Sequence, residues 1–154
     1  MWVGTNEKKT GVLVNKCDIF ENRCGIYVDT GNIVNIQYSS IHNNQGTGIC
    51  LSGKDGPPNF PQTIQGRTTI VHSVIRDNGG NGLNVEGQWA AVDQCKVNGN
   101  GRSGIRIGDG GSGDITNNDL TKNMMLSISG SGAIRKQDNK ESIRLLGFLS
   151  NWTQ

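Results

Sequence analysis

Five side chains in the first half of the chain combine aromatic, cationic and acidic groups at matching spacings. Tyr38 and His42 are followed 34 residues later by His72 and Arg76, and Asp77 stands next to Arg76. Aromatic rings can stack on the flat faces of sugars, and charged groups can pair with acidic sugars. We therefore expect these five residues to form a saccharide-binding site. The alternative is an ordinary solvated face, because any fold must place polar residues on its surface.

Four carboxylates are candidates for catalysis, namely Asp29, Asp55, Glu86 and Asp109. A pair of carboxyl groups roughly 5–10 Å apart can hydrolyse a glycosidic bond. If Asp29 and Glu86 belong to strands two layers apart in a stack, their separation is roughly 10 Å, at the upper end of that range. Turn chemistry explains the same residues equally well, because an Asp side chain bonds readily to nearby backbone in turns.

The spacing of these residues follows an internal repeat. The stretch CDIFENRCGIYV (17–28) recurs as SSIHNNQGTGICL (39–51), SVIRDNGGNGLNV (73–85), CKVNGNGRSGIRI (95–107) and, in degraded form, NDLTKNMMLSI (118–128). One apolar residue anchors each copy, and successive anchors are 22, 34, 22 and 23 residues apart: Ile19, Ile41, Ile75, Val97 and Leu120. A fixed period of this length is typical of a solenoid, in which each repeat packs only on its neighbours.

Each copy places the same kinds of residue at the same offsets from its anchor. An apolar residue precedes the anchor, and two alternating apolar residues in a later strand follow it; in the last copy we assign these two to Leu126 and Ile128. An asparagine always stands three residues after the anchor: Asn22, Asn44, Asn78, Asn100 and Asn123. We expect these asparagines to adopt left-handed backbone and to bond from one coil to the next. We expect positive φ at the glycines before the later strands, which are Gly25, Gly48, Gly82 and Gly104.

Three short strands per repeat, joined by corners of glycine and asparagine, predict an all-β fold, a single-stranded parallel β-helix of about five coils. A leucine-rich repeat has a similar period and an asparagine column, but it needs an L-x-x-L-x-L pattern that the chain lacks. We assign residues 1–129 to the β-helix and residues 53–65, which contain all three prolines, to an insertion loop. Such a loop is either part of a binding face or a tolerated surface decoration.

Residues 130–154 depart from the repeat, with a glycine-serine stretch, a charged patch and an apolar run. Both ends of a β-helix expose unpaired strand edges and an open core. We therefore expect this segment to cap the β-helix or to contact another subunit. The chain also enters patterned sequence almost at once, so we expect it to be a piece of a longer protein.

The composition argues against several classes of protein. Net charge is +2 without a dense basic run, so we expect no nucleic-acid partner. No apolar run is long enough to cross a bilayer, so we expect no membrane insertion. The four cysteines form no C-x-x-C pair and have no histidine at zinc spacing, so we expect no metal, no cofactor and no disulfide. Free thiols fit assembly in a reducing cytosol.

Residues 11–128, with their recurring G-I-x-V and asparagine motifs, resemble the right-handed parallel β-helix of the pectin-lyase-like superfold. That superfold includes pectate lyases, polygalacturonases, alginate epimerases and the shafts of bacteriophage tailspikes. The local signatures of the enzymes are missing: the chain has no Asp-Pro-His, no Asn-Thr-Asp, Asp-Asp or Gly-His-Gly, and no Asp-His calcium site. The resemblance therefore carries over no catalytic residue.

Among these proteins, the chain is most similar to the shaft of a bacteriophage tailspike or tail appendage. The resemblance implies a homotrimer in the virion tail, assembled in the host cytoplasm and acting outside the cell. It implies a structural and receptor-binding role, with bacterial surface polysaccharide as the partner. The alternative is a fragment of a polysaccharide-active enzyme, either a lyase, a glycoside hydrolase or an epimerase. A third candidate is a cell-surface adhesin.

Overall fold

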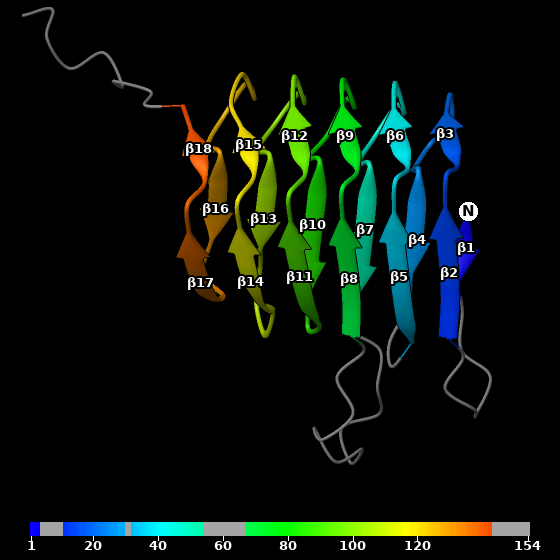
Figure 1. Cartoon of the computed structure of the whole chain (residues 1–154), viewed down its shortest axis with the longest axis horizontal. Helices are drawn as coiled ribbons and strands as arrows, with labels where there is room; N and C mark the ends of the chain where they lie inside the picture. The colour runs from blue at the N-terminus through cyan, green and yellow to red at the C-terminus, as the bar shows by residue number, and fades with distance from the viewer. Residues whose placement is uncertain (4–10, 30–31, 54–66, 143–154) are drawn as a thin grey trace, which may run out of the picture.

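The computed structural model of the chain describes residues 1–3, 11–29, 32–53 and 67–142. Its strands form three sheets, and successive strands of the chain enter the three sheets in turn (Figure 1). Neighbours within a sheet are therefore three elements apart along the chain, and they pair in parallel. This arrangement is a parallel β-helix, so the fold class predicted from the repeat is confirmed.

The three sheets differ in strand length. Sheet 1 contains β1 (Trp2–Val3), β4 (Ile26–Val28), β7 (Ile49–Ser52), β10 (Leu83–Glu86), β13 (Ile105–Ile107) and β16 (Ile128–Gly130). Sheet 2 contains the longest strands: β2 (Gly11–Asn15), β5 (Ile33–Gln37), β8 (Arg67–Val71), β11 (Trp89–Asp93), β14 (Ser112–Thr116) and β17 (Ala133–Gln137). Sheet 3 contains β3 (Asp18–Phe20), β6 (Ser40–His42), β9 (Val74–Arg76), β12 (Lys96–Asn98), β15 (Asp119–Leu120) and β18 (Lys140–Glu141).

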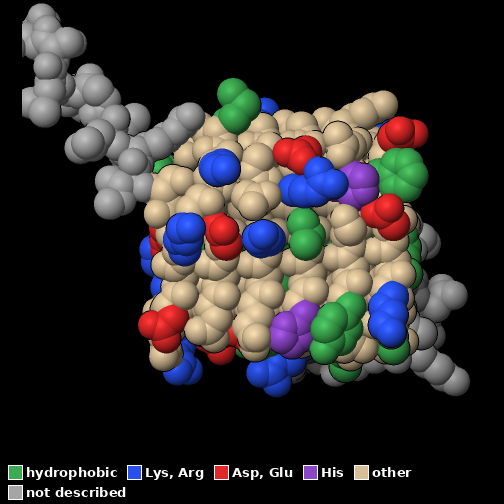
Figure 2. All heavy atoms as spheres, turned by 45° about the horizontal axis from the view of Figure 1, so that its top comes forward, with side chains coloured by type: hydrophobic (Ala, Val, Ile, Leu, Met, Phe, Trp, Pro, Cys, Tyr) green, Lys and Arg blue, Asp and Glu red, His purple; other side chains and the backbone are tan. Residues whose placement is uncertain are grey.

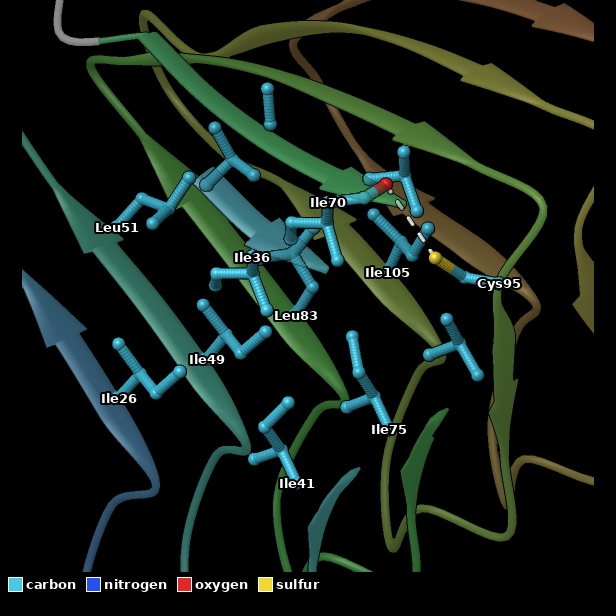
Figure 3. Close-up of a cluster of buried hydrophobic side chains, with 14 of the residues drawn as sticks. Ile26, Ile36, Ile41, Ile49, Leu51, Ile70, Ile75, Leu83, Cys95 and Ile105 are labelled. Atoms are coloured by element: carbon cyan, nitrogen blue, oxygen red, sulfur yellow. Dashed lines mark hydrogen bonds between the residues drawn. The ribbon is translucent and has the colours of Figure 1, made fainter. Parts of the chain in front are cut away.

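Alternate residues of the strands point inward and stack in columns, because side chains of a β-strand alternate between its two faces. Ile36 pairs with Val14 on one side and Ile70 on the other, and all three side chains are buried. Ile41 stacks in the same way on Ile75 in sheet 3. Figure 3 shows these columns meeting in one apolar core. Burying one such side chain stabilises the fold by about 1.5–3 kcal/mol, so these columns are the main source of stability.

The asparagine column forms a ladder along the corner that follows sheet 3. The side-chain amide of Asn44 donates to Oδ1 of Asn78 (2.9 Å), and that of Asn78 donates to Oδ1 of Asn100 (3.0 Å). The same Oδ1 atoms accept a backbone N–H from the preceding rung, as from Asn78 to Asn100 (3.2 Å). The predicted bonding between coils is present, but the left-handed backbone lies one residue before the rungs, at Glu21, Asn43, Asp77, Gly99 and Lys122.

The glycines before the strands of sheet 1 are required for a different reason from the predicted one. None of the four has positive φ. A Cβ at Gly48 would meet Nδ2 of Asn78 and the carbonyl oxygen of Gly82, each at 2.8 Å. The close approach of neighbouring coils, rather than an unusual backbone conformation, therefore selects glycine at this corner.

The last copy of the repeat is placed two residues later than predicted. Ile128, not Leu126, pairs with Ile105, and the Leu126 side chain is exposed. The offset from the anchor Leu120 to Ile128 is the same as in the three preceding copies, for example from Ile41 to Ile49, while the first copy is one residue shorter. The assignment of Leu126 to the core was wrong for this reason.

The β-helix extends past residue 129. Strand β17 pairs with β14 along its whole length, and β18 pairs with β15. Part of the segment 130–154 therefore belongs to the repeat, while residues 143–154 lie outside the described residues. Most of the expected insertion loop, residues 54–65, also lies outside them. Within the described ranges no helix is long and apolar enough to cross a membrane.

Candidate functional site

Sheet 3 and the two corners that border it carry all five candidate saccharide-binding residues; we call this surface the sheet 3 face. Figure 2 shows both histidines on it, each beside a hydrophobic side chain, with acidic and basic groups around them. Strand pairing places His42 next to Arg76. Tyr38 and His72 lie at the corner before sheet 3, where both have left-handed backbone, with φ of 50° and 48°. Equivalent positions in neighbouring coils stand side by side, so the repeat itself assembles this face.

The rings of Tyr38 and His72 form a stacked pair. Their centroids are 5.1 Å apart and their planes differ by 12°. Tyr38 is 56% exposed, so much of the pair is accessible from solvent. The sequence places these two residues in one column, and the structure adds that their rings contact each other face to face.

A fixed carboxylate, Asp93, lies in the electrostatic field of His72. Its side chain accepts hydrogen bonds from Thr116 Oγ1 (2.7 Å), Asn117 Nδ2 (2.8 Å) and Gln94 Nε2 (3.0 Å). These hydrogen bonds hold the pKa of Asp93 below its ordinary value, and the nearby His72 acts in the same direction. Asp93 was not among the candidate residues, because it lies at the end of a sheet 2 strand, outside the columns of Tyr38 and His42.

A second stacked pair, Phe20 and His42, lies on sheet 3 itself. The ring centroids are 5.3 Å apart with a 12° angle between planes. The His42 side chain is only 17% exposed, and its Nε2 lies 2.8 Å from Oδ1 of Asp18. Its Nδ1 lies 2.7 Å from Oδ1 of Asn43. His42 is therefore held in one orientation by a ring on one side and polar partners at both nitrogens.

Arg76 extends the same column, and its guanidinium pairs with Asp77 at 2.5 Å. Both side chains are close to half exposed, at 43% and 46%, so solvent screens this ion pair strongly. An exposed pair of this kind contributes little to stability, and its groups are accessible to a charged or hydroxyl-rich ligand.

The orientation of the rings changes what the sheet 3 face can bind. Because Tyr38 stacks on His72 and Phe20 on His42 from coil to coil, the rings cover one another's faces and turn their edges outward. A sugar ring therefore cannot stack on the faces that the two rings of a pair turn toward each other. The outward edges present the phenol hydroxyl and imidazole nitrogens, which suit hydrogen bonds to sugar hydroxyls. Phe20 was not among the five candidates, although its offset from the anchor is that of His42.

Two of the candidate catalytic carboxylates share a column at the corner after sheet 1. Glu86 pairs with Ser52, and Asp29 stands in the same column one coil before Ser52. Two strand spacings separate the two acids, roughly 10 Å. The Glu86 carboxylate lies 2.7 Å from Nη1 of Arg106, so it is engaged in an ion pair.

The other two carboxylates do not strengthen this arrangement. Asp109 lies at the corner of a later coil, where its side chain accepts from the Ser131 hydroxyl (3.0 Å) and its carbonyl accepts from the Gly87 N–H (3.1 Å). Both contacts link Asp109 to neighbouring coils. Asp55 lies outside the described residues. The carboxylates and the sheet 3 face belong to different corners of the coil, so the two candidate sites do not merge into one.

All four cysteines are free. Cys95 is buried in the core, where its Sγ points toward the carbonyl of Ile70 at 3.5 Å (Figure 3). Burial raises the pKa of this thiol to about 11. Cys17, in the same column, is exposed, while Cys24 and Cys50 are half-buried. Among the described residues, no cluster of His, Cys, Asp and Glu could hold a metal ion.

Comparison with known proteins agrees with the architecture. Residues 4–88 match the family described as the right-handed beta helix region. This match covers more than half of the chain, and the chain belongs to that family. No curated protein and no solved structure matches the chain. Family membership establishes a right-handed parallel β-helix, a fold compatible with proteins that bind or process polysaccharides, and it assigns no ligand.

Proposed function

We propose that the protein is the β-helical part of a bacteriophage tailspike or tail appendage, and that its sheet 3 face binds bacterial surface polysaccharide. The observation that carries this proposal is the pair of stacked ring columns flanked by Arg76, Asp77 and Asp18 on one face. Hydrogen-bonding edges and accessible charges suit a ligand rich in hydroxyl and carboxylate groups.

The rigidity and period of the face support the same proposal. The asparagine ladder and the buried columns fix each coil on the next, so the surface groups are preorganised. Equivalent positions, occupied by different polar and aromatic side chains, recur every strand spacing, roughly 4.8 Å, which is close to the length of one sugar in an extended polysaccharide. A periodic face of this kind can contact several successive sugars of one chain.

Cleavage of the bound polysaccharide is the second candidate function. It rests on Asp29 and Glu86, whose shared column gives a separation of roughly 10 Å, at the upper limit for inverting hydrolysis. The ion pair between Glu86 and Arg106 weighs against it, because the carboxylate is already bound by a cation.

Binding to capsular and cell-wall polysaccharides, measured by isothermal titration calorimetry, tests the proposal. Tyr38→Ala and Arg76→Ala should each weaken binding about tenfold, the effect of losing roughly 1.4 kcal/mol of contacts. Tyr27→Ala is the matched control, because this tyrosine lies on sheet 1, away from the face, and should bind as the wild type. Equal affinity of all three variants would contradict the proposal.

Two further measurements separate the candidates. A homotrimer in solution, measured by light scattering, is the expected result for a tailspike shaft, and a monomer would contradict that part of the proposal. Release of oligosaccharides from the polysaccharide would support the enzymatic alternative, and Glu86→Gln should then abolish it.

A further inference from the structure

Three consecutive large apolar side chains are exposed at the corner between β15 and β16. Met124 is 61% exposed, Met125 55% and Leu126 50%; we call these residues the Met124–Leu126 patch. Their backbone is ordered, because the N–H groups of Met124 and Met125 donate to the carbonyls of Asn100 (2.9 Å) and Arg102 (3.1 Å). The equivalent corners of earlier coils carry small or polar residues there, including Gly79, Gly80, Gly101 and Arg102. A contiguous apolar patch on a fixed backbone indicates a surface that is covered by a partner.

The chain arrives directly beside this patch at Ser142. The Ser142 hydroxyl accepts a hydrogen bond from the backbone N–H of Lys122 (2.9 Å), and its own N–H donates to the Ser127 hydroxyl (3.0 Å). Lys122 and Ser127 flank the patch on both sides, so Ser142 is held over the same corner. The residues that follow in the sequence are rich in apolar side chains: Ile143, Leu145, Leu146, Phe148, Leu149 and Trp152.

The register of the last strands gives an offset that can be compared with the positions of these apolar residues in the sequence. Glu141 pairs with Leu120, an offset of 21 residues. If this offset continued, Leu145 and Leu146 would align with Met124 and Met125. Apolar residues therefore follow in the sequence at the offset that would align them with the apolar patch.

Open backbone acceptors at the same corner support this register. In the fourth coil, the carbonyls of Asn100 and Arg102 accept N–H groups from the corner of the fifth. The equivalent carbonyls of the fifth coil belong to Asn123 and Met125, and no described residue donates to them. Backbone donors from a further layer of chain would satisfy them in the way that every earlier corner is satisfied.

The last layer of the core differs from the Met124–Leu126 patch, because it includes charged side chains. Lys136 takes the column position of Ile115, and Glu141 takes that of Leu120. The two charged side chains lie 3.4 Å apart as an ion pair. Inward-pointing charges of this kind end a β-stack without apolar cover. Ile134, which pairs with Gly113, stays partly buried against the core beside this ion pair.

We propose that the Met124–Leu126 patch is the docking site of the chain's own residues 143–154, which add one more layer to this corner. The proposal is independent of polysaccharide binding. It predicts that the patch and the segment stabilise the protein as one unit.

A double-mutant cycle on thermal unfolding tests the proposal. One variant ends at Ser142, the second carries Met124→Ser, Met125→Ser and Leu126→Ser, and the third combines both changes. Each single change should lower Tm by a few degrees, and the combination should lower it no further. The matched control replaces two exposed apolar residues of sheet 2, Leu13→Ser and Ile33→Ser, whose effect should add fully to that of truncation. Full additivity at the patch would overturn the proposal.

Trp152 gives a second readout in the full-length chain. With Trp2 and Trp89 replaced by Phe, fluorescence comes from Trp152 alone. Its emission should shift to longer wavelength when the three patch residues become Ser, because the indole becomes exposed to water. An unchanged emission would overturn the proposal. A patch variant that converts an oligomer to monomers would overturn it as well, since a second copy would then be the occupant.

Discussion

Asn100 shows how much a single residue contributes to the β-helix. It is fully buried, its amide donates to Ile75 O (3.2 Å) and Asn123 Oδ1 (2.9 Å), and its Oδ1 accepts two bonds from Asn78. Asn100→Ala leaves these groups without partners, and we expect it to lower the free energy of unfolding by about 3 kcal/mol. Urea unfolding measures the change.

The first rung of the same ladder, Asn22, provides the control. Asn22 is exposed and occupies the first rung, so water can replace the bonds that its side chain loses. We expect Asn22→Ala to lower the free energy of unfolding by less than about 1 kcal/mol. Equal losses at the two positions would show that burial does not determine the contribution of a rung.

Asp93 predicts a pH dependence of stability. In the folded protein, hydrogen bonds from Thr116, Asn117 and Gln94 hold the pKa of the Asp93 carboxyl below its ordinary value of 3.8. As pH falls, the unfolded chain therefore binds the proton first. The contribution of Asp93 is complete well above pH 3.8 and is lost as pH falls through the lower, folded-state pKa. The stability difference between wild type and Asp93→Asn, measured by urea unfolding, should shrink between pH 6 and about pH 2. A constant difference over that range would contradict this account.

At the scale of single residues, the sequence predicted which side chains share a column and missed how they are oriented. The repeat placed Tyr38 beside His72 and His42 beside Arg76, because column membership follows from spacing alone. Ring stacking depends on side-chain torsion angles at the corner, which spacing does not encode. The left-handed corner positions were missed for a related reason, since Lys16, Tyr38, His72 and Gln94 share no residue type that indicates positive φ.

The corners between strands limit which residues each coil can accept. A Cβ at Gly48 would collide with the next coil at 2.8 Å, where it meets the ladder amide of Asn78 and the backbone carbonyl of Gly82. We expect Gly48→Ala to lower the free energy of unfolding by about 1–3 kcal/mol. Gly11→Ala is the control, because a Cβ there meets nothing within 4 Å, and its stability should stay equal or rise slightly. Comparable losses in the two variants, measured by urea unfolding, would contradict the steric explanation.

At the scale of elements, the sequence predicted the strands wherever apolar columns continued and missed them where the columns ended. Strands β17 and β18 carry Lys136 and Glu141 at inward positions, so the apolar signal disappears while strand pairing continues. The last corner was assigned two residues short, because Leu126 and Ile128 fit an alternating pattern equally well. Only the corner length shared by the three preceding copies distinguishes the two registers.

The whole molecule is a linear stack, in which each strand pairs only with the equivalent strands of the adjacent coils. The free energy of unfolding of such a protein is approximately a sum over coils and the interfaces between them. Removing one period should therefore leave a shorter β-helix with the same core, provided that the columns stay in register.

Deletion of residues 75–96 tests this expectation, because it joins Val74 directly to Val97, the partner of Ile75 in the neighbouring coil. Ile41 would then stack on Val97, and Asn44 would donate to Asn100 in place of Asn78, so the core column and the ladder both continue. We expect a folded protein with an unchanged β-type circular dichroism spectrum and a lower urea m-value, since one coil less of surface is exposed on unfolding. Deletion of residues 75–85 is the control: it removes half a period, misaligns every column behind it and should not fold. If both deletions fold, or neither does, register between coils is not what specifies this β-helix.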